Sequence, residues 1–378
     1  MPVTKGGLED VIAANSTICD IIGPEGKLTY RGIDIHDLAR NSSFEETTYL
    51  LWFGSLPTRD ALRQFSAELA SHRALPSQVL TLMKDFPRNA TPMDATRTAL
   101  SALAFYDPQA HDSSREANVA KAMRVTAQIA TIVAAYEQIR RGRDPVEPEA
   151  SGSHAENFLR MISGAEPDQL FVRAMDLALI LHADHELNAS TFAARVTAAT
   201  LADIYSAIVS AIGALAGPLH GGANEQVMKM LQRIGEPSRA EAYVTETLQA
   251  HQKISGFGHR VYRTEDPRAT HLRQMSKQLG EHIGNLRWYE ISRQVEEAVM
   301  RQKRIYANVD FYSASCYFTM GIPIDMFTPV FAVSRIAGWT AHVLEQYGDN
   351  RLIRPRAEYL GEKDVAYVPI ERRAKAAS

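Results

Sequence analysis

The stretch IYSAIVSAIGALAGPLHGGANE, residues 204–225, contains the most apolar run of the chain and ends in a turn rich in proline and glycine. The run at 204–219 is too short to cross a bilayer, so it predicts a helix buried in a protein core. Pro218 ends that helix, and the paired glycines behind it permit a tight backbone and the close approach of a ligand. A new helix can begin at Ala223, which places His220 near a helix N-terminus, where the helix dipole favours a neutral imidazole. Taken alone, the stretch is explained more simply by a helix–helix elbow with a capping histidine.

Helical patterns dominate the rest of the chain as well. Long helix-forming stretches lie at 168–186, 191–216, 291–304 and 328–346. Strand signals are few, and the clearest predicts a small hairpin from 17–22 and 27–31 around a Gly-Pro-Glu-Gly turn. Strands and helices do not alternate, which argues against a parallel α/β sheet, and the absence of a repeat argues against a solenoid. The sequence therefore predicts a mainly α fold with a small N-terminal β-hairpin.

Composition narrows the class of protein. The chain has 378 residues, 45% of them hydrophobic and 22% charged, with a formal net charge of −3, which excludes a disordered protein. The near-neutral balance without a basic block argues against a nucleic-acid-binding protein, and the N-terminus lacks the layout of a secretory signal. Cys19 and Cys316 are too few for a disulfide scaffold or a cysteine-rich zinc module. We therefore expect a cytoplasmic protein with a large core and no membrane or nucleic-acid partner.

Two histidines mark the end of the stretch at 168–186. His182 and His185 continue its apolar stripe, and histidines at this spacing can share a metal. The zinc-protease patterns HExxH and HxxEH are both absent, however. A hydrogen-bonded pair of core histidines, a metal site and a ligand-facing role all remain open for this pair.

A glycine-rich loop lies between residues 253 and 263. Gly256 and Gly258 lack the third glycine and the preceding strand of a dinucleotide fingerprint. Together with Lys253, Arg260 and Arg263 the loop can cradle phosphates, and Arg268 extends the cationic set. The simpler alternative is a solvated basic loop.

One acid and two arginines complete the inventory. Asp310 lies between Val309 and Phe311, where loss of water would raise its pKa and make it a better proton acceptor near neutral pH. The alternative for Asp310 is a helix-capping role. Arg335 lies among apolar neighbours and Arg354 on a proline turn, and each guanidinium needs a carboxylate from the protein or from a substrate.

Considered jointly, these residues suit one kind of chemistry. A nucleophile elbow, a catalytic cysteine setting and a P-loop are all missing from the sequence. Histidines in tight settings, one desolvated aspartate and several arginines suit proton abstraction next to a carbonyl, with arginine clamps on a partner that carries several carboxylates.

Eight segments then resemble the citrate synthase family, in the family's order and over nearly the whole chain. They are LTYRGIDIHDLA (28–39), HADHELNAS (182–190), GPLHGGANE (217–225), GFGHRVY (256–262), DPR (266–268), NVDFYSA (308–314), FAVSRIAGW (331–339) and IRPRAEYLG (353–361). The resemblance implies a nearly all-α homodimer whose large domain comprises residues 1–221 and 326–378. A small domain at 222–325 would close over the substrates.

The resemblance also implies roles for single residues. Asp310 would take a methyl proton from acetyl-CoA, His220 would hold the thioester oxygen, and His259 would polarise the ketone of oxaloacetate and protonate the new alkoxide. His185 would bind oxaloacetate, and Arg73 would be a further substrate contact. The further substrate-binding residues would be Arg268, Arg335 and Arg354, the last of which would reach in from the partner subunit. The implied coenzyme A contacts are Lys253, Ile254, Ser255, Gly256, Phe257 and Arg263. No metal or tightly bound cofactor is implied.

The resemblance leaves the acyl group open. The short form and segments such as TPMDATRTALSAL also resemble 2-methylcitrate synthase, which uses propionyl-CoA. One methylene in a pocket is worth roughly 1–3 kcal/mol, so both activities can coexist in one protein. More distant alternatives are an inactive helical scaffold, which the intact Asp310, His220 and His259 disfavour, and a zinc hydrolase centred on His182 and His185.

Overall fold

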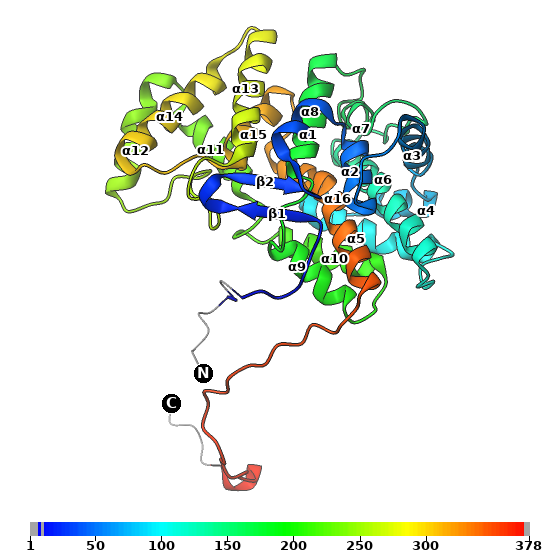
Figure 1. Cartoon of the computed structure of the whole chain (residues 1–378). Helices are drawn as coiled ribbons and strands as arrows, with labels where there is room; N and C mark the ends of the chain where they lie inside the picture. The colour runs from blue at the N-terminus through cyan, green and yellow to red at the C-terminus, as the bar shows by residue number, and fades with distance from the viewer. Residues whose placement is uncertain (1–6, 9–10, 374–378) are drawn as a thin grey trace.

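A computed structural model describes residues 7–8 and 11–373. Helices dominate this part of the chain and strands are confined to one small sheet, so the prediction of a mainly α fold is confirmed (Figure 1). The strands are β1 (Cys19–Ile22), β2 (Lys27–Tyr30) and β3 (Ile33–Asp34). The helices are α1 (Ile35–Asn41), α2 (Phe44–Phe53), α3 (Arg59–Ser71), α4 (Ser77–Lys84), α5 (Pro92–Leu103), α6 (Arg115–Arg140), α7 (His154–Ser163), α8 (Gln169–His182), α9 (Ala189–Ala198), α10 (Ile204–Leu215), α11 (Ala223–Ile234), α12 (Ala240–Gln249), α13 (Pro267–His282), α14 (Arg287–Lys303), α15 (Val309–Thr319) and α16 (Phe327–Gly348).

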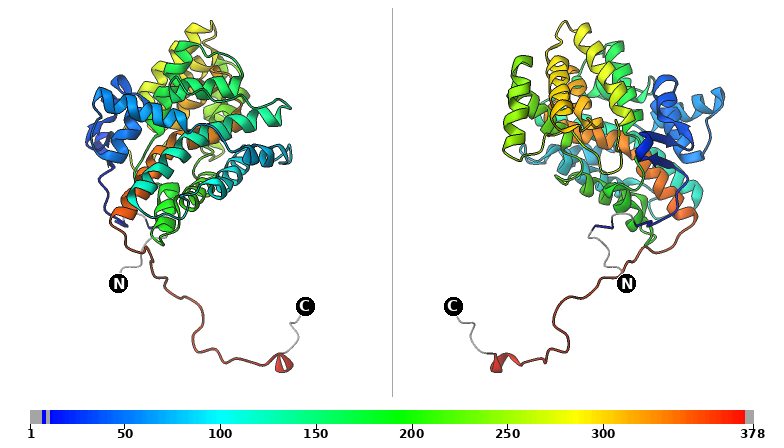
Figure 2. Two further views of the ribbon diagram at one scale, coloured as in Figure 1. Left: turned by 90° about the vertical axis from the view of Figure 1, so that its right-hand side faces the viewer. Right: turned by 60° about the vertical axis from the view of Figure 1, so that its left-hand side comes forward.

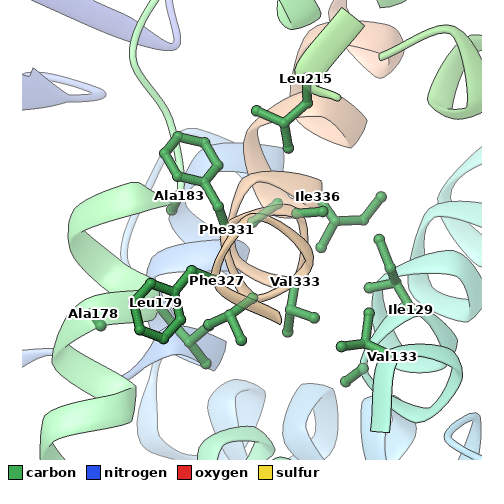
Figure 3. Close-up of a cluster of buried hydrophobic side chains, with 14 of the residues drawn as sticks. Ile129, Val133, Ala178, Leu179, Ala183, Leu215, Phe327, Phe331, Val333 and Ile336 are labelled. Atoms are coloured by element: carbon green, nitrogen blue, oxygen red, sulfur yellow. The ribbon is translucent and has the colours of Figure 1, made fainter. Parts of the chain in front are cut away.

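Helix α16 forms the centre of the core. Its apolar side chains pack against α6, α8 and α10, with Phe331 and Ile336 facing Leu215 and Ile129 (Figure 3). Gly338 lies so close to the loop after α8 that a Cβ atom there would be 2.3 Å from the carbonyl oxygen of Ala183. This close approach requires glycine, and it fixes the loop after α8 against α16.

The predicted hairpin is confirmed, and a third strand joins it. β1 and β2 pair antiparallel with Cys19 opposite Tyr30, and the short β3 adds to β2. A Cβ atom on Gly23, in the hairpin turn, would be 2.3 Å from the carbonyl oxygen of Val261. The Arg263 N–H also donates to the Gly23 carbonyl (3.1 Å). The hairpin is thus docked against the glycine-rich loop.

The single helix predicted at 191–216 is wrong. The structure has two helices there, α9 and α10, which pack against each other. Leu201 has a positive φ of 63°, and the Asp203 side chain accepts a hydrogen bond from the Ser206 N–H (3.0 Å), so it caps α10. A left-handed residue followed by an aspartate cap ends one helix and starts the next. The stretch at 168–186 likewise ends as a helix at His182, which leaves His185 in a loop.

Helices α11 to α15 lie together on one side of the molecule, and the remaining helices surround α16 on the other (Figures 1 and 2). Beyond α16 the chain leaves the body as an extended tail, and Leu360 and Tyr367 of this tail are 88% and 82% exposed (Figure 1). In the described residues, no helix is both long enough and apolar enough to cross a membrane.

Candidate active site

A pocket of about 910 Å³ brings six of the predicted residues together. His185, on the loop after α8, and His220, on the turn before α11, line it with Arg335 of α16. The residues that face them from the α11–α15 side are His259, Arg268 and Asp310. The pocket therefore lies between the two groups of helices, with chemically active side chains from both.

The position of His220 follows from the turn between α10 and α11. The Ser190 N–H donates to His220 Nε2 (3.3 Å), and the Ser190 hydroxyl lies 2.8 Å from the same nitrogen. Trp339 Nε1 donates to that hydroxyl (3.1 Å), whose single proton lies within reach of both His220 Nε2 and Asn188 Oδ1 (2.8 Å each). Because Nε2 accepts a backbone N–H, the proton of the neutral ring is on Nδ1. Burial, with a contribution from the charge of Arg335, lowers the pKa of His220 to about 4, so the ring is neutral at physiological pH.

His259 has the opposite tautomer. The backbone N–H groups of Val261 and Tyr262 both donate to its Nδ1 atom, over 3.0 and 3.1 Å. The proton of the neutral ring is therefore on Nε2, where it can be donated to an oxygen. Burial and the nearby charge of Arg268 lower the pKa of His259 to about 4. Its ring centroid is 5.1 Å from that of His185.

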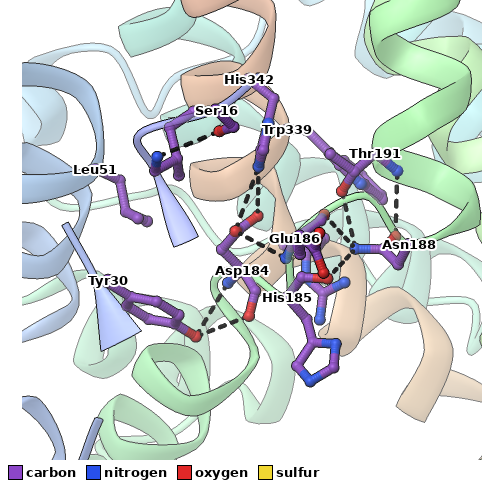
Figure 4. A network of polar contacts seen from close by, with 12 residues as sticks. Ser16, Tyr30, Leu51, Asp184, His185, Glu186, Asn188, Thr191, Trp339 and His342 are labelled. Carbon is purple, nitrogen blue, oxygen red and sulfur yellow. Dashed lines mark hydrogen bonds and ion pairs between the residues drawn. The ribbon is translucent and has the colours of Figure 1, made fainter. Parts of the chain in front are cut away.

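His185 is held by the loop that α16 fixes. Tyr30 Oη donates to the backbone carbonyl of Asp184 (2.9 Å), and the Asp184 carboxylate lies 3.3 Å from His342 Nε2 (Figure 4). His185 Nε2 in turn lies 3.2 Å from the hydroxyl of Tyr262. Burial, with nearby positive charge, holds the pKa of His185 well below its usual range. His185 is therefore a neutral hydrogen-bonding group at the pocket wall.

Asp310 lies in the first turn of α15. The helix cap is Asn308, whose side chain accepts from the Asp310 N–H (3.1 Å), so the capping alternative for Asp310 does not hold. In the described part of the chain, no hydrogen bond to the Asp310 carboxylate is found. Burial raises the pKa of this carboxyl to about 6 although Arg268 lowers it. A carboxylate in this state is a competent proton acceptor near neutral pH.

The two pocket arginines differ in their partners. Asp266 binds Arg268 through two hydrogen bonds, from Nε to Oδ1 (2.9 Å) and from Nη2 to Oδ2 (2.8 Å). Arg335 Nε donates to the backbone carbonyl of His182 (2.6 Å), and its guanidinium lies 4.7 Å from the ring centre of Phe331. Among the described residues no ion pair is found for Arg335. Its positive charge is therefore available to an anion in the pocket.

The residues expected to contact coenzyme A lie beside the pocket. Gly258, His259 and Arg260 line it, whereas the predicted set Lys253, Ile254, Ser255, Gly256, Phe257 and Arg263 does not. The rings of Phe257 and Phe311 pack at a tilt with 4.6 Å between centroids, and the Gly256 carbonyl accepts from the Asn308 N–H (2.9 Å). These contacts join the loop to the start of α15, which carries Asp310. Of the three loop cations that the sequence suggested for phosphate binding, Arg260 lines the pocket, although the family resemblance did not imply it as a coenzyme A contact.

Two predicted substrate contacts lie away from the pocket. Arg73 is buried, and its guanidinium donates to the backbone carbonyls of Glu149, Ser151 and Gly152, each over 2.9 Å. This arginine closes a loop at 149–152 and does not line the pocket, so a substrate contact by Arg73 stays a prediction. Arg354 lies in the exposed tail and does not line the pocket of its own chain.

His182 and His185, at the end of α8 and just after it, have different surroundings. His182 is buried, with its Nδ1 atom 2.8 Å from the Ala178 carbonyl and its ring 5.0 Å from that of Phe331. It is the core histidine of the pair, whereas His185 faces the pocket. Over residues 7–8 and 11–373, no group of three or more His, Cys, Asp or Glu side chains is placed to hold a metal ion.

Several residues that contact the pocket side chains were not predicted from the sequence. Tyr262 contacts His185, Asp266 neutralises Arg268, and Ser190 fixes the tautomer of His220. All three lie within the segments that carry the family resemblance, and that resemblance is the signal that could have identified them. Leu8 and Val11 also line the pocket, and nothing in the sequence indicated that the N-terminal segment would reach it.

Fold and pocket together define a mainly helical protein with an acid–base pocket between two groups of helices. A family model described as "Citrate synthase, C-terminal domain" matches residues 7–356. The chain belongs to the citrate synthase family. It is 53% identical over 375 residues to citrate synthase 2 of Bacillus subtilis, covering 99% of this chain and 100% of the relative.

Other relatives fit the same assignment. A citrate synthase of Haloferax volcanii is 51% identical over 374 residues, covering 98% of this chain and 99% of the relative. A 2-methylcitrate synthase of Mycobacterium tuberculosis is 42% identical over 362 residues, covering 96% of this chain and 92% of the relative. Among solved structures, citrate synthase of Thermoplasma acidophilum in a ternary complex with carboxymethyl coenzyme A and oxaloacetate superposes with a TM-score of 0.92 at 33% identity, covering 97% of this chain and 98% of that one.

Proposed function

We propose that this chain condenses acetyl-CoA with oxaloacetate to citryl-CoA and hydrolyses this intermediate to citrate and coenzyme A. One observation carries the proposal: a carboxylate with a pKa of about 6 shares one pocket with two neutral histidines that present protons from opposite ring nitrogens. The reaction needs one group that takes a proton and two that donate hydrogen bonds to carbonyl oxygens, and this set supplies them.

Oxaloacetate would bind first. Arg335, which lacks a carboxylate of the protein, would take one substrate carboxylate, and Arg268 would contribute its remaining donors beside Asp266. The Nε2 proton of His259 would hydrogen-bond the ketone oxygen and draw electrons from the ketone carbon. His185 would add a further neutral hydrogen bond from the loop after α8.

Proton abstraction would follow at the thioester. Asp310 takes a proton from the acetyl methyl group, and the electron pair of the broken C–H bond moves into the thioester carbonyl to form an enolate. The Nδ1 proton of His220 stabilises the oxygen on which the negative charge develops. The enolate carbon then attacks the ketone carbon of oxaloacetate, and the new alkoxide receives the Nε2 proton of His259. Water finally cleaves the thioester of citryl-CoA.

Domain movement would assemble this site. We propose residues 222–325 as a small domain and residues 1–221 and 326–378 as a large domain. The pocket draws His259, Arg268 and Asp310 from the first and His185, His220 and Arg335 from the second. Closure would bring the two sets together and exclude water, and the segment 253–263 would hold the coenzyme.

We also propose a homodimer in which Arg354 reaches the pocket of the partner subunit. The exposed tail beyond α16 carries Arg354 away from the pocket of its own chain, and the apolar side chains of that tail are uncovered. No metal would take part, and acyl-CoA would act as a cosubstrate. The free thiols Cys19 and Cys316 suit a cytoplasmic setting.

The test is the release of free coenzyme A from acetyl-CoA by the purified protein, followed with a thiol reagent. We expect release only when oxaloacetate is present, and we expect citrate to accumulate in equal amount. Turnover of acetyl-CoA without oxaloacetate would contradict the proposed order of steps. Loss of activity with a metal chelator would instead favour a metal-dependent hydrolase.

A second candidate is 2-methylcitrate synthesis from propionyl-CoA, favoured by the relative of that name at 42% identity. The two reactions use the same catalytic groups and differ by one methylene in the acyl pocket, worth roughly 1–3 kcal/mol. The ratio of kcat/KM for acetyl-CoA to that for propionyl-CoA decides between them. A ratio above one assigns the chain to citrate synthesis, and a ratio below one to the alternative.

A further inference from the structure

A second cleft, of about 240 Å³, lies at the C-terminal ends of α4 and α6. The side chains that matter for its chemistry are Lys84, Phe86, Arg88, Tyr136, Arg140 and Arg143. The cleft shares no residue with the catalytic pocket, and the proposed reaction uses none of its side chains. We call it the basic cleft.

Its charges are only partly compensated. Lys84 pairs with Asp144, the carboxylate of the cleft wall, at 3.2 Å. Elsewhere on the wall, Arg88 and Arg143 have no carboxylate partner and no side-chain hydrogen bond within residues 7–8 and 11–373. Two uncompensated guanidinium groups on one concave surface attract an anion of charge near −2.

The volume of the basic cleft and the side chains of its wall indicate what kind of anion fits it. Planar guanidinium groups bind phosphate oxygens in pairs, which favours a phosphate group over a single carboxylate. The rings of Phe86 and Tyr136, 6.4 Å apart, add an apolar wall. The volume is below that of usual cofactor sites. We infer that the basic cleft is a binding site for a small phosphate-bearing anion.

The cleft also contacts the proposed domain boundary. Arg140 donates from Nη2 to Asp325 Oδ1 (2.8 Å) and pairs with Asp325 through Nη1 as well, while Glu137 holds its Nε. Asp325 lies in the short 3₁₀ turn Ile324–Met326, through which the chain returns from the α11–α15 side into α16. An anion in the cleft competes with Asp325 for Arg140. Binding there therefore loosens the ion pair at which the two groups of helices join.

The test uses the full chain and pyrophosphate as the probe, titrated calorimetrically at constant ionic strength. We expect saturable binding at millimolar or lower concentration. The double variant Arg88→Gln/Arg143→Gln should weaken it by about tenfold or more, because it removes two charge-assisted hydrogen bonds. The variant Asp325→Asn should strengthen binding, because it removes the carboxylate that competes for Arg140.

Two controls separate this site from others. Arg63→Gln removes an exposed cation on α3 that lines neither cleft, and it should leave the affinity unchanged. Arg260→Gln removes a cation of the catalytic pocket and should also have no effect. Absence of saturable binding, equal affinity in the Arg88→Gln/Arg143→Gln protein, or loss of binding in Arg260→Gln would each overturn the assignment. Unchanged affinity in Asp325→Asn would overturn the competition for Arg140. Opposite shifts in the two cleft variants cannot arise from misfolding alone.

Discussion

Arg268 and Arg335 lie in opposite walls of one pocket and are almost equally buried, with 3% and 2% of their surfaces exposed. Arg268 is neutralised by the bidentate contact with Asp266, whereas Arg335 has a carbonyl and an aromatic ring as neighbours. The first arrangement is complete without a ligand. The second leaves a buried cation that costs stability until an anion arrives.

The pKa values express the same contrast. Asp266 raises the pKa of Arg268 despite burial, while burial lowers the pKa of Arg335. In the proposed reaction, the wall built from α16 is therefore the one that oxaloacetate would complete. The wall built from the segment 256–268 and α15 is preformed, and its task is to place His259 and Asp310.

The largest effect should come from the group that transfers the proton, because neither arginine can replace it. We expect Asp310→Asn to lower kcat by about 10²–10⁴, since a base acts in the transition state. Oxaloacetate affinity, measured by calorimetry, should stay close to that of the unaltered chain, because the arginines are untouched. A collapse of oxaloacetate binding in this variant would make Asp310 a structural residue.

The next effect tests the comparison directly. Arg268→Met leaves the buried Asp266 carboxylate without its counter-charge and with only the backbone N–H groups of residues 268 and 309 as donors. Loss of one member of a buried pair costs about 3–5 kcal/mol. Arg335→Met removes a cation that has no ion-pair contact and only the more distant charge of Asp184 to balance it, so the unfolding midpoint in urea without substrate should fall much less. Both variants should bind oxaloacetate poorly.

A matched control separates charge from packing in that pair of variants. Arg268→Met combined with Asp266→Asn removes both charges, so it should recover part of the stability that Arg268→Met loses. Equal destabilisation by Arg268→Met and Arg335→Met would mean that Asp184 balances Arg335 as fully as Asp266 balances Arg268, and the contrast between the walls would fail.

A smaller effect concerns the third arginine, which neither wall contains. Arg354→Ala should weaken oxaloacetate binding by about tenfold or more, the usual loss for a charge-assisted hydrogen bond. Mixed dimers with Asp310→Asn subunits then decide which pocket it serves. If Arg354 serves the partner, one pocket of each mixed dimer holds both groups, and activity returns. No recovery would place Arg354 at the pocket of its own subunit.

The sequence alone predicted features that depend on neighbouring residues. The turn at His220, the helix that begins at Ala223 and the desolvated setting of Asp310 follow from local pattern, and the structure has all three. Features that depend on distant contacts were missed. The guanidinium of Arg73 donates to backbone carbonyls of the loop at 149–152, and no pattern in the sequence around Arg73 predicts this contact. The break between α9 and α10 depends on a left-handed Leu201, which helix propensity does not predict.

The smallest effect is a pH dependence that separates proton transfer from charge recognition. Burial raises the pKa of Asp310 to about 6, so the base is lost as the pH falls through 6. We expect kcat/KM for acetyl-CoA to fall by about tenfold per unit below that pH, because only the ionised carboxylate accepts a proton. His220 and His259 have pKa values of about 4 and stay neutral over this range. Oxaloacetate affinity should stay level, because the arginines keep their charge.

Stability should move in the opposite direction to activity. A carboxyl whose pKa is raised by folding binds its proton more tightly in the folded chain, so its contribution is fully present below the unfolded value of 3.8 and is lost as the pH rises through about 6. Asp310→Asn has no such titration. The unfolding midpoint of Asp310→Asn should therefore rise relative to that of the unaltered chain as the pH increases from 4 to 7. Parallel stability curves for the two proteins would show that burial does not raise the pKa of Asp310, and the acid limb of kcat/KM would then belong to another group.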